Sequence, residues 1–136
     1  MDRERGAISL KFMLNEHGFQ TNFEFGELKI SGQAEYGYRP FQLMISSIAG
    51  CSGGVLRNIL QKMRLSFEDI IIEAKVTRNK DETNRIEHIH FTYIIEGKNI
   101  PSEKIEKALK LARKNCSMIQ SVQDSIQITE DFQLKP

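Results

Sequence analysis

Residues 39–64, RPFQLMISSIAGCSGGVLRNILQKMR, form a long apolar segment around which the rest of the chain must fold. Pro40 suits the first turn of a helix, where its missing N–H would have no partner in any case. Apolar side chains then recur at steps of three and four, the spacing of one helix face: Phe41, Met44, Ile48, Cys51, Val55, Ile59 and Met63. The pattern predicts a helix from Phe41 to about Arg64 that protein covers on several sides.

Three glycines lie close to Cys51 inside this predicted helix. Gly50, Gly53 and Gly54 each weaken a helix interior by about 0.8–1 kcal/mol relative to alanine. Small residues let another backbone, a second helix or a substrate approach the thiol closely. Tight helix packing without any chemistry is the alternative, and the sequence leaves both explanations open.

Length and composition limit the classes of protein that this chain can belong to. Its 136 residues suit one domain over residues 1–136, and 40% hydrophobic with 27% charged residues is the balance of a globular protein. A formal net charge of +1 supplies no field that would attract nucleic acid or a membrane surface. The N-terminal MDRERGAISL contains no apolar run of signal-peptide length, so we expect a cytoplasmic protein.

The flanking segments alternate between apolar and polar residues, as strands do. We expect strands over residues 8–14 and 23–30, with a bulge or tight turn at Gly26–Glu27. Strands over 70–77 and 88–96 form a hairpin around the polar turn NKDETN.

A second helix begins near Pro101 or Ser102 and ends at Cys116, with its apolar stripe at Ile105, Ala108, Leu109, Ala112 and Cys116. Ser117 and Gln120 have the spacing of a capping box for a short helical turn. A last strand covers 126–134, with one fault in its alternation at Glu130.

This order of elements predicts an α+β fold with a mostly antiparallel sheet. The long apolar helix needs cover on more sides than one sheet provides. A second copy of the chain, in a homodimer, would supply the remaining cover.

Cys51 and Cys116 both project from the apolar faces of predicted helices. In a reducing compartment two cysteines are more typical of catalysis, redox chemistry or metal binding than of a permanent disulfide, and inert packing is the remaining explanation. Cys116 precedes a predicted helix start and lies near Arg113 and Lys114, which favours a thiolate there. Cys51 has no charged neighbour within three positions.

His88 and His90 are two positions apart on a predicted strand and point the same way, as metal ligands can. Zinc requires three or four ligands, and the cysteines belong to buried faces elsewhere. We therefore expect two solvated histidines and no metal or other cofactor.

Residues 39–64 resemble the central-helix motif of the OsmC/Ohr family, in which a proline precedes an aliphatic run that ends at a cysteine flanked by small residues. Residues 104–122, KIEKALKLARKNCSMIQSV, resemble the family's second motif, a helix that ends in a cysteine followed by a short helix. The hairpin over 70–97 fits between the two motifs, and the resemblance extends from about Ile8 to Leu134. The subgroup with GGCS and YCSV at its cysteines is the most similar, and this chain has AGCS and NCSM.

The resemblance implies a thiol-dependent peroxidase that reduces organic hydroperoxides in the response to oxidative stress. It implies that Cys51 attacks the peroxide and becomes a sulfenic acid, and that Cys116 resolves it as a disulfide, which a dithiol reductant then reduces. It also implies an intertwined homodimer, with sheets wrapped around two long central helices and with sites at the subunit interface.

Two activating residues of the family have no counterpart in this chain. Phe41 stands where the family has a glutamate ten positions before the first cysteine, and the turn NEHG at residues 15–18 offers no arginine. Arg39 is the candidate replacement for the missing cation. Two functions therefore stay open: a peroxidase that uses Cys51 and Cys116, or a binding protein that holds a small apolar ligand at the dimer interface, with Phe41 in the pocket wall.

Overall fold

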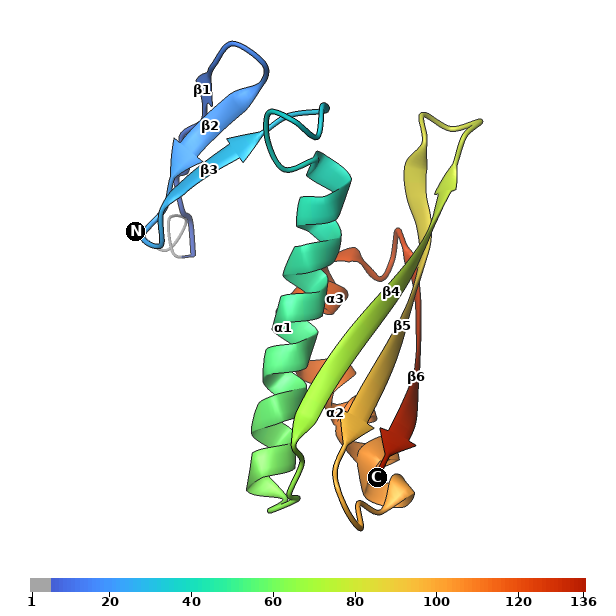
Figure 1. The fold of residues 1–136 in the computed structure, drawn as a ribbon. Helices are drawn as coiled ribbons and strands as arrows, with labels where there is room; N and C mark the ends of the chain where they lie inside the picture. Colours follow the sequence, from blue (N-terminus) through green and yellow to red (C-terminus); the bar gives the residue numbers. More distant parts are fainter. Residues whose placement is uncertain (1–5) are drawn as a thin grey trace. The chain divides into compact units, whose positions relative to one another are not determined.

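The computed structural model describes residues 6–136 and divides into two compact units, one that ends at Leu43 and one that runs from Met44 to Pro136 (Figure 1). The boundary falls inside helix α1 (Pro40–Lys62). Each unit is described below by itself, and a single domain over residues 1–136 stays a prediction.

The first unit contains three short antiparallel strands in the order β1 (Met13–Leu14), β2 (Phe19–Asn22) and β3 (Glu27–Ile30). Two backbone hydrogen bonds between Phe23 and Gly26, of 3.0 and 3.1 Å, close the β2–β3 turn and agree with a turn near Gly26. The strand expected over 23–30 is wrong at its start, because residues 23–26 form this turn and β3 begins at Glu27. The strand expected over residues 8–14 is wrong in length. A strand requires a hydrogen-bonded neighbour, and within residues 8–14 the residues that pair with β2 are Met13 and Leu14.

Helix α1 confirms the predicted long helix and begins at Pro40, the position that proline favours. Its fully buried side chains are Ile48, Ser52, Leu56 and Leu60. The predicted apolar face is therefore rotated, since Cys51 lies at the margin of the buried face and is half-buried. The sequence pattern could not show this because the centre of the buried face includes a serine.

Length and composition alone would allow α1 to cross a membrane. Its buried face instead belongs to the hydrophobic core of the second unit, together with apolar side chains of the sheet and of helix α2 (Ser102–Asn115). We therefore describe α1 as the core helix of this unit.

The second unit contains a sheet in the order β4 (Asp69–Asn79), β5 (Arg85–Glu96) and β6 (Gln127–Lys135). Strands β4 and β5 form the predicted antiparallel hairpin. Strand β6 runs parallel to β5, because helices α2 and α3 (Ser117–Val122) form a crossover between them. The predicted alternation of β5 is confirmed, because Ile89, Phe91, Tyr93 and Ile95 are all fully buried.

The capping of the two shorter helices differs from the expected pattern. Pro101 is the N-cap of α2, and its side chain makes no capping bond. Helix α3 begins at Ser117 as predicted, but the Cys116 sulfur is its cap and accepts the Ile119 N–H at 3.4 Å. No capping box forms, because Gln120 donates to the Arg113 carbonyl oxygen at 3.1 Å. The apolar stripe of α2 is confirmed, with every member buried.

Candidate active site at Cys51 and Cys116

Two cysteines that are 65 positions apart in the sequence meet in the second unit. Cys51 comes from the middle of α1, and Cys116 joins α2 to α3; both are free thiols. The two thiols are close enough for each to affect the pKa of the other. The Ser117 hydroxyl oxygen lies 3.7 Å from the same sulfur. Cys51 is half-buried, whereas Cys116 is fully buried.

The surroundings of Cys51 favour its thiolate form. The backbone N–H of Met118 is the strongest influence and lowers the pKa of Cys51, against the opposing effect of burial. Hydrogen bonds from the Ser117 hydroxyl, the Cys116 thiol and the Ser117 N–H lower this pKa further. Amide groups at the start of a helix stabilise negative charge, so the first turn of α3 acts on a sulfur that belongs to another helix.

Cys116 has the opposite tendency. Burial raises the pKa of Cys116 most, the Ile119 N–H opposes this effect, and the nearby Cys51 raises the pKa further. The sequence expectation of a thiolate at Cys116 is therefore wrong. Arg113, which supported that expectation, instead donates from Nη1 to the Ile128 carbonyl oxygen at 2.8 Å and lies 3.8 Å from Glu130 Oε1.

A chain of polar side chains lies in the core next to this pair. Ser52 Oγ is 2.5 Å from Tyr93 Oη. The Tyr93 hydroxyl in turn donates a hydrogen bond to Glu130 Oε2 at 2.7 Å. Burial raises the pKa of Tyr93 above its ordinary value. Sequence reasoning did not assign a role to these residues. The break in the alternation of β6 at Glu130 was the one visible signal, because that position points a carboxylate into the core.

The glycines near Cys51 have different surroundings. A Cβ atom at Gly53 would approach Ile72 Cδ1 to 2.7 Å, so this glycine allows β4 to pack closely on α1. A Cβ atom at Gly50 or Gly54 would meet nothing within 4 Å. These two glycines line an open groove of about 300 Å³ against β4, together with Ala49, Gly53, Arg57, Ile70 and Ile72. Packing therefore explains one glycine, whereas the other two leave a face of α1 open.

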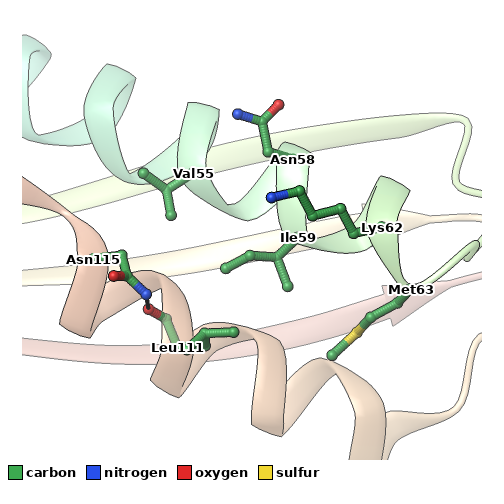
Figure 2. Close-up of a pocket in the computed structure, with 7 residues that line it drawn as sticks. All are labelled: Val55, Asn58, Ile59, Lys62, Met63, Leu111 and Asn115. Atoms are coloured by element: carbon green, nitrogen blue, oxygen red, sulfur yellow. Dashed lines mark hydrogen bonds between the residues drawn. The ribbon is translucent and has the colours of Figure 1, made fainter.

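A larger groove of about 470 Å³ runs between α1 and α2 (Figure 2). Its apolar lining comes from both helices and from the residue after α1, and its polar groups are two asparagines and a lysine: Val55, Ile59, Met63, Leu111, Asn58, Asn115 and Lys62. Val55 lies one helical turn after Cys51, and Asn115 immediately precedes Cys116. The groove thus involves sequence neighbours of both cysteines, and its volume suits a small molecule.

His88 and His90 are half-buried rather than simply solvated. Both rings contact Thr129 Oγ1, at 2.7 and 2.6 Å, and His90 Nε2 lies 3.2 Å from Asp131 Oδ1. Within residues 6–136 no group of three or more His, Cys, Asp or Glu side chains is arranged to hold a metal ion.

The positions where the OsmC/Ohr resemblance expects activating residues have other contacts in the first unit. The Arg39 guanidinium lies over the Phe41 ring, 5.1 Å from its centre. Arg39 Nε is buried and has no hydrogen-bond partner among the described residues. In the NEHG turn, the His17 ring stacks on Tyr36 with 3.5 Å between ring centres. Whether Arg39 replaces the missing cation stays a prediction.

Comparison with known proteins identifies the family. Residues 31–131 match the OsmC-like protein family, so the chain belongs to it. Its sequence is 24% identical over 96 residues to the organic hydroperoxide resistance protein OhrB of Bacillus subtilis, a match that covers 71% of this chain and 70% of that protein.

Solved structures show the same fold. A hypothetical protein from Aquifex aeolicus superposes with a TM-score of 0.84 at 27% identity, over 93% of this chain and 95% of the other. An OsmC-like protein from Mycoplasma pneumoniae gives 0.81 at 14% identity, with 94% and 96% covered. The OhrB crystal structure gives 0.64 at 20% identity, with 93% and 98% covered. The expected OsmC-like α+β fold is therefore confirmed.

Proposed function

We propose that this protein is a thiol-dependent peroxidase that reduces organic hydroperoxides through Cys51 and Cys116. The observation that carries the proposal is the meeting of two unlike thiols, one with a lowered pKa at a half-buried site and one that is buried with a raised pKa. The name of the OhrB relative supports the substrate class.

In the first step the Cys51 thiolate attacks the terminal oxygen of the hydroperoxide ROOH. The S–O bond forms as the O–O bond breaks, the alkoxide takes a proton from water and leaves as the alcohol ROH, and Cys51 becomes a sulfenic acid. The Met118 N–H and the Ser117 hydroxyl lower the pKa of Cys51 and so favour the thiolate of the attacking sulfur. They perform part of the task that the OsmC/Ohr resemblance assigns to an arginine and a glutamate.

In the second step the Cys116 sulfur attacks the Cys51 sulfur. The S–S bond forms as the S–O bond breaks, and the hydroxide leaves as water with the proton of the Cys116 thiol. A dithiol reductant then exchanges with this disulfide, supplying two electrons and two protons and becoming a disulfide itself. The sequence of steps needs no metal or other cofactor, and we expect it to take place in the cytoplasm.

We also propose that the protein is a homodimer. Apolar side chains of the first unit remain largely exposed, including Ile8 at 82%, Leu14 at 77% and Phe25 at 106% of their reference areas. Many exposed apolar side chains in one short segment are typical of an interface with another chain. A second copy is the partner that the sequence analysis expects.

A binding protein is the second candidate function. The observation in its favour is the groove between α1 and α2, whose apolar lining suits a ligand without any reaction. The absence of the family's glutamate at Phe41 agrees with it.

One experiment separates the two functions. Reduced protein is mixed with a few equivalents of an alkyl hydroperoxide, and free thiols are counted by mass spectrometry within minutes. A peroxidase loses both thiols as a Cys51–Cys116 disulfide and releases one alcohol per disulfide. Two intact thiols would refute the peroxidase and leave the binding protein.

A further inference from the structure

The chain Ser52–Tyr93–Glu130 links three separate elements through the core. Ser52 comes from α1, Tyr93 from β5 and Glu130 from β6. Ser52 and Tyr93 are fully buried, and the Glu130 side chain is only 10% exposed. Tyr93 has a single hydroxyl proton and donates it to Glu130, so Ser52 must donate to Tyr93. Each hydroxyl therefore has a defined role in one directed chain.

Such a chain is an expensive way to fill a core. Burying polar groups costs free energy that only well-made hydrogen bonds offset, and apolar residues of similar volume often serve stability as well. Both bonds are short, and the Tyr93 hydroxyl is fully engaged. A purpose beyond packing would explain why these polar groups occupy the core.

The two ends of the chain lie next to the two cysteine-bearing segments. Ser52 directly follows Cys51 on α1. At the other end, Glu130 lies 3.8 Å from Arg113 in the last turn of α2, three positions before Cys116. Arg113 also holds the Ile128 carbonyl oxygen of β6 at 2.8 Å. The hydrogen-bonded side chains therefore connect α1, which carries Cys51, with α2, which ends next to Cys116. The connection passes through Tyr93 on β5 and Glu130 on β6.

We propose that Tyr93 is a positioning residue for the Cys51–Cys116 pair, because its hydroxyl ties the Cys51 turn of α1 to the Glu130–Arg113 anchor of α2. The inference rests on the proposed function in treating the two cysteines as a reacting pair. Holding two reactants in place raises their effective concentration toward one another. Tyr93 touches neither peroxide nor reacting sulfur in this role and acts through Ser52.

The thiol–disulfide equilibrium of the pair with dithiothreitol measures this effective concentration without any peroxide. Oxidised dithiothreitol takes two electrons and two protons from Cys51 and Cys116, which form a disulfide, and becomes reduced dithiothreitol. Tyr93→Phe keeps the ring and removes the hydroxyl. We expect it to lower the equilibrium constant for forming the disulfide roughly 5- to 10-fold, the worth of about one net hydrogen bond. Ser52→Ala, a smaller change, should shift it in the same direction, and the double variant should add little.

One control variant separates positioning from ordinary stability. Thr129→Val removes the hydroxyl that contacts His88 and His90 in the same sheet. It should weaken the fold while leaving the hydrogen bonds of Tyr93 intact. We expect its equilibrium constant to stay within about 2-fold of the wild type, because a purely structural loss affects the reduced and oxidised forms alike.

Circular dichroism confirms that each variant is folded before the titration. A Tyr93→Phe shift no larger than that of Thr129→Val overturns the inference, as does an unchanged Ser52→Ala. Failure of the proposed function is a separate result: the wild type would form the disulfide with dithiothreitol yet consume no hydroperoxide. Full peroxide consumption with an unshifted Tyr93→Phe equilibrium would overturn the positioning role alone.

Discussion

Ser117→Ala tests how the chain activates Cys51. The substitution removes a hydroxyl 3.7 Å from the Cys51 sulfur and leaves the cap of α3, which is Cys116, in place. Hydrogen bonds to charged groups contribute about 1.5–3 kcal/mol. This one is long and its acceptor is only half-buried, so solvent reduces its worth to about 1 kcal/mol. The Met118 N–H, which lowers the pKa of Cys51 most, is untouched.

The expected effect changes sign with pH. Below the pKa of Cys51, a loss of about 1 kcal/mol reduces the thiolate fraction about 5-fold. A more basic thiolate is also a better nucleophile, with a Brønsted coefficient of about 0.4–0.5, which restores about half of the loss on a logarithmic scale. The variant should therefore react about 2- to 3-fold more slowly at low pH and about 2-fold faster well above the pKa.

Alkylation of Cys51 by iodoacetamide, followed from pH 5 to 10 by mass spectrometry, provides the measurement, since Cys116 is buried and reacts slowly. Ser121→Ala is the matched control, because the Ser121 hydroxyl belongs to the same short helix and donates to the Ser117 carbonyl oxygen at 2.7 Å. A Ser117→Ala profile that coincides with the Ser121→Ala profile at every pH would refute the activation argument.

The remaining predictions concern the reaction and the assembly. The rate constant for hydroperoxide consumption should rise with pH through the lowered pKa of Cys51 and level off before a free cysteine at about 8.5 would, so a profile with its midpoint above that value contradicts the thiolate assignment. Cys51→Ser should abolish consumption, whereas Cys116→Ser should complete one turnover and leave a sulfenic acid on Cys51 that dimedone traps for mass spectrometry. Equal activity in both variants would reject these roles. Phe25→Lys should weaken the proposed dimer and lower the sedimentation coefficient at micromolar concentration; a wild type that sediments as a monomer excludes the dimer.

Sequence periodicity was sufficient for the elements whose burial follows one simple rule. The helix from Pro40, the β4–β5 hairpin and the apolar stripe of α2 all appear where the pattern placed them. The pattern was insufficient where burial needs a partner. Ser52 is polar, and its hydrogen bond to Tyr93 offsets the cost of burying its hydroxyl on the buried face of α1.

The same distinction applies to the candidate site. The residue types and the two motifs identified Cys51 and Cys116 as the candidate site residues. Charge in the neighbouring sequence then favoured a thiolate at the wrong cysteine, because Arg113 turns away to β6. Local sequence cannot show which distant sulfur faces the first amides of α3.

The sequence by itself determined the class of fold, the order of its elements and the identity of the two thiols, because apolar periodicity and motif spacing are local properties. Only the tertiary structure decided which thiol has the lowered pKa, and it did so by placing the Met118 N–H of one helix against Cys51 of another while burying Cys116. Short-range hydrogen bonds and desolvation set these pKa shifts, and both depend on contacts between residues about 65 positions apart in the sequence.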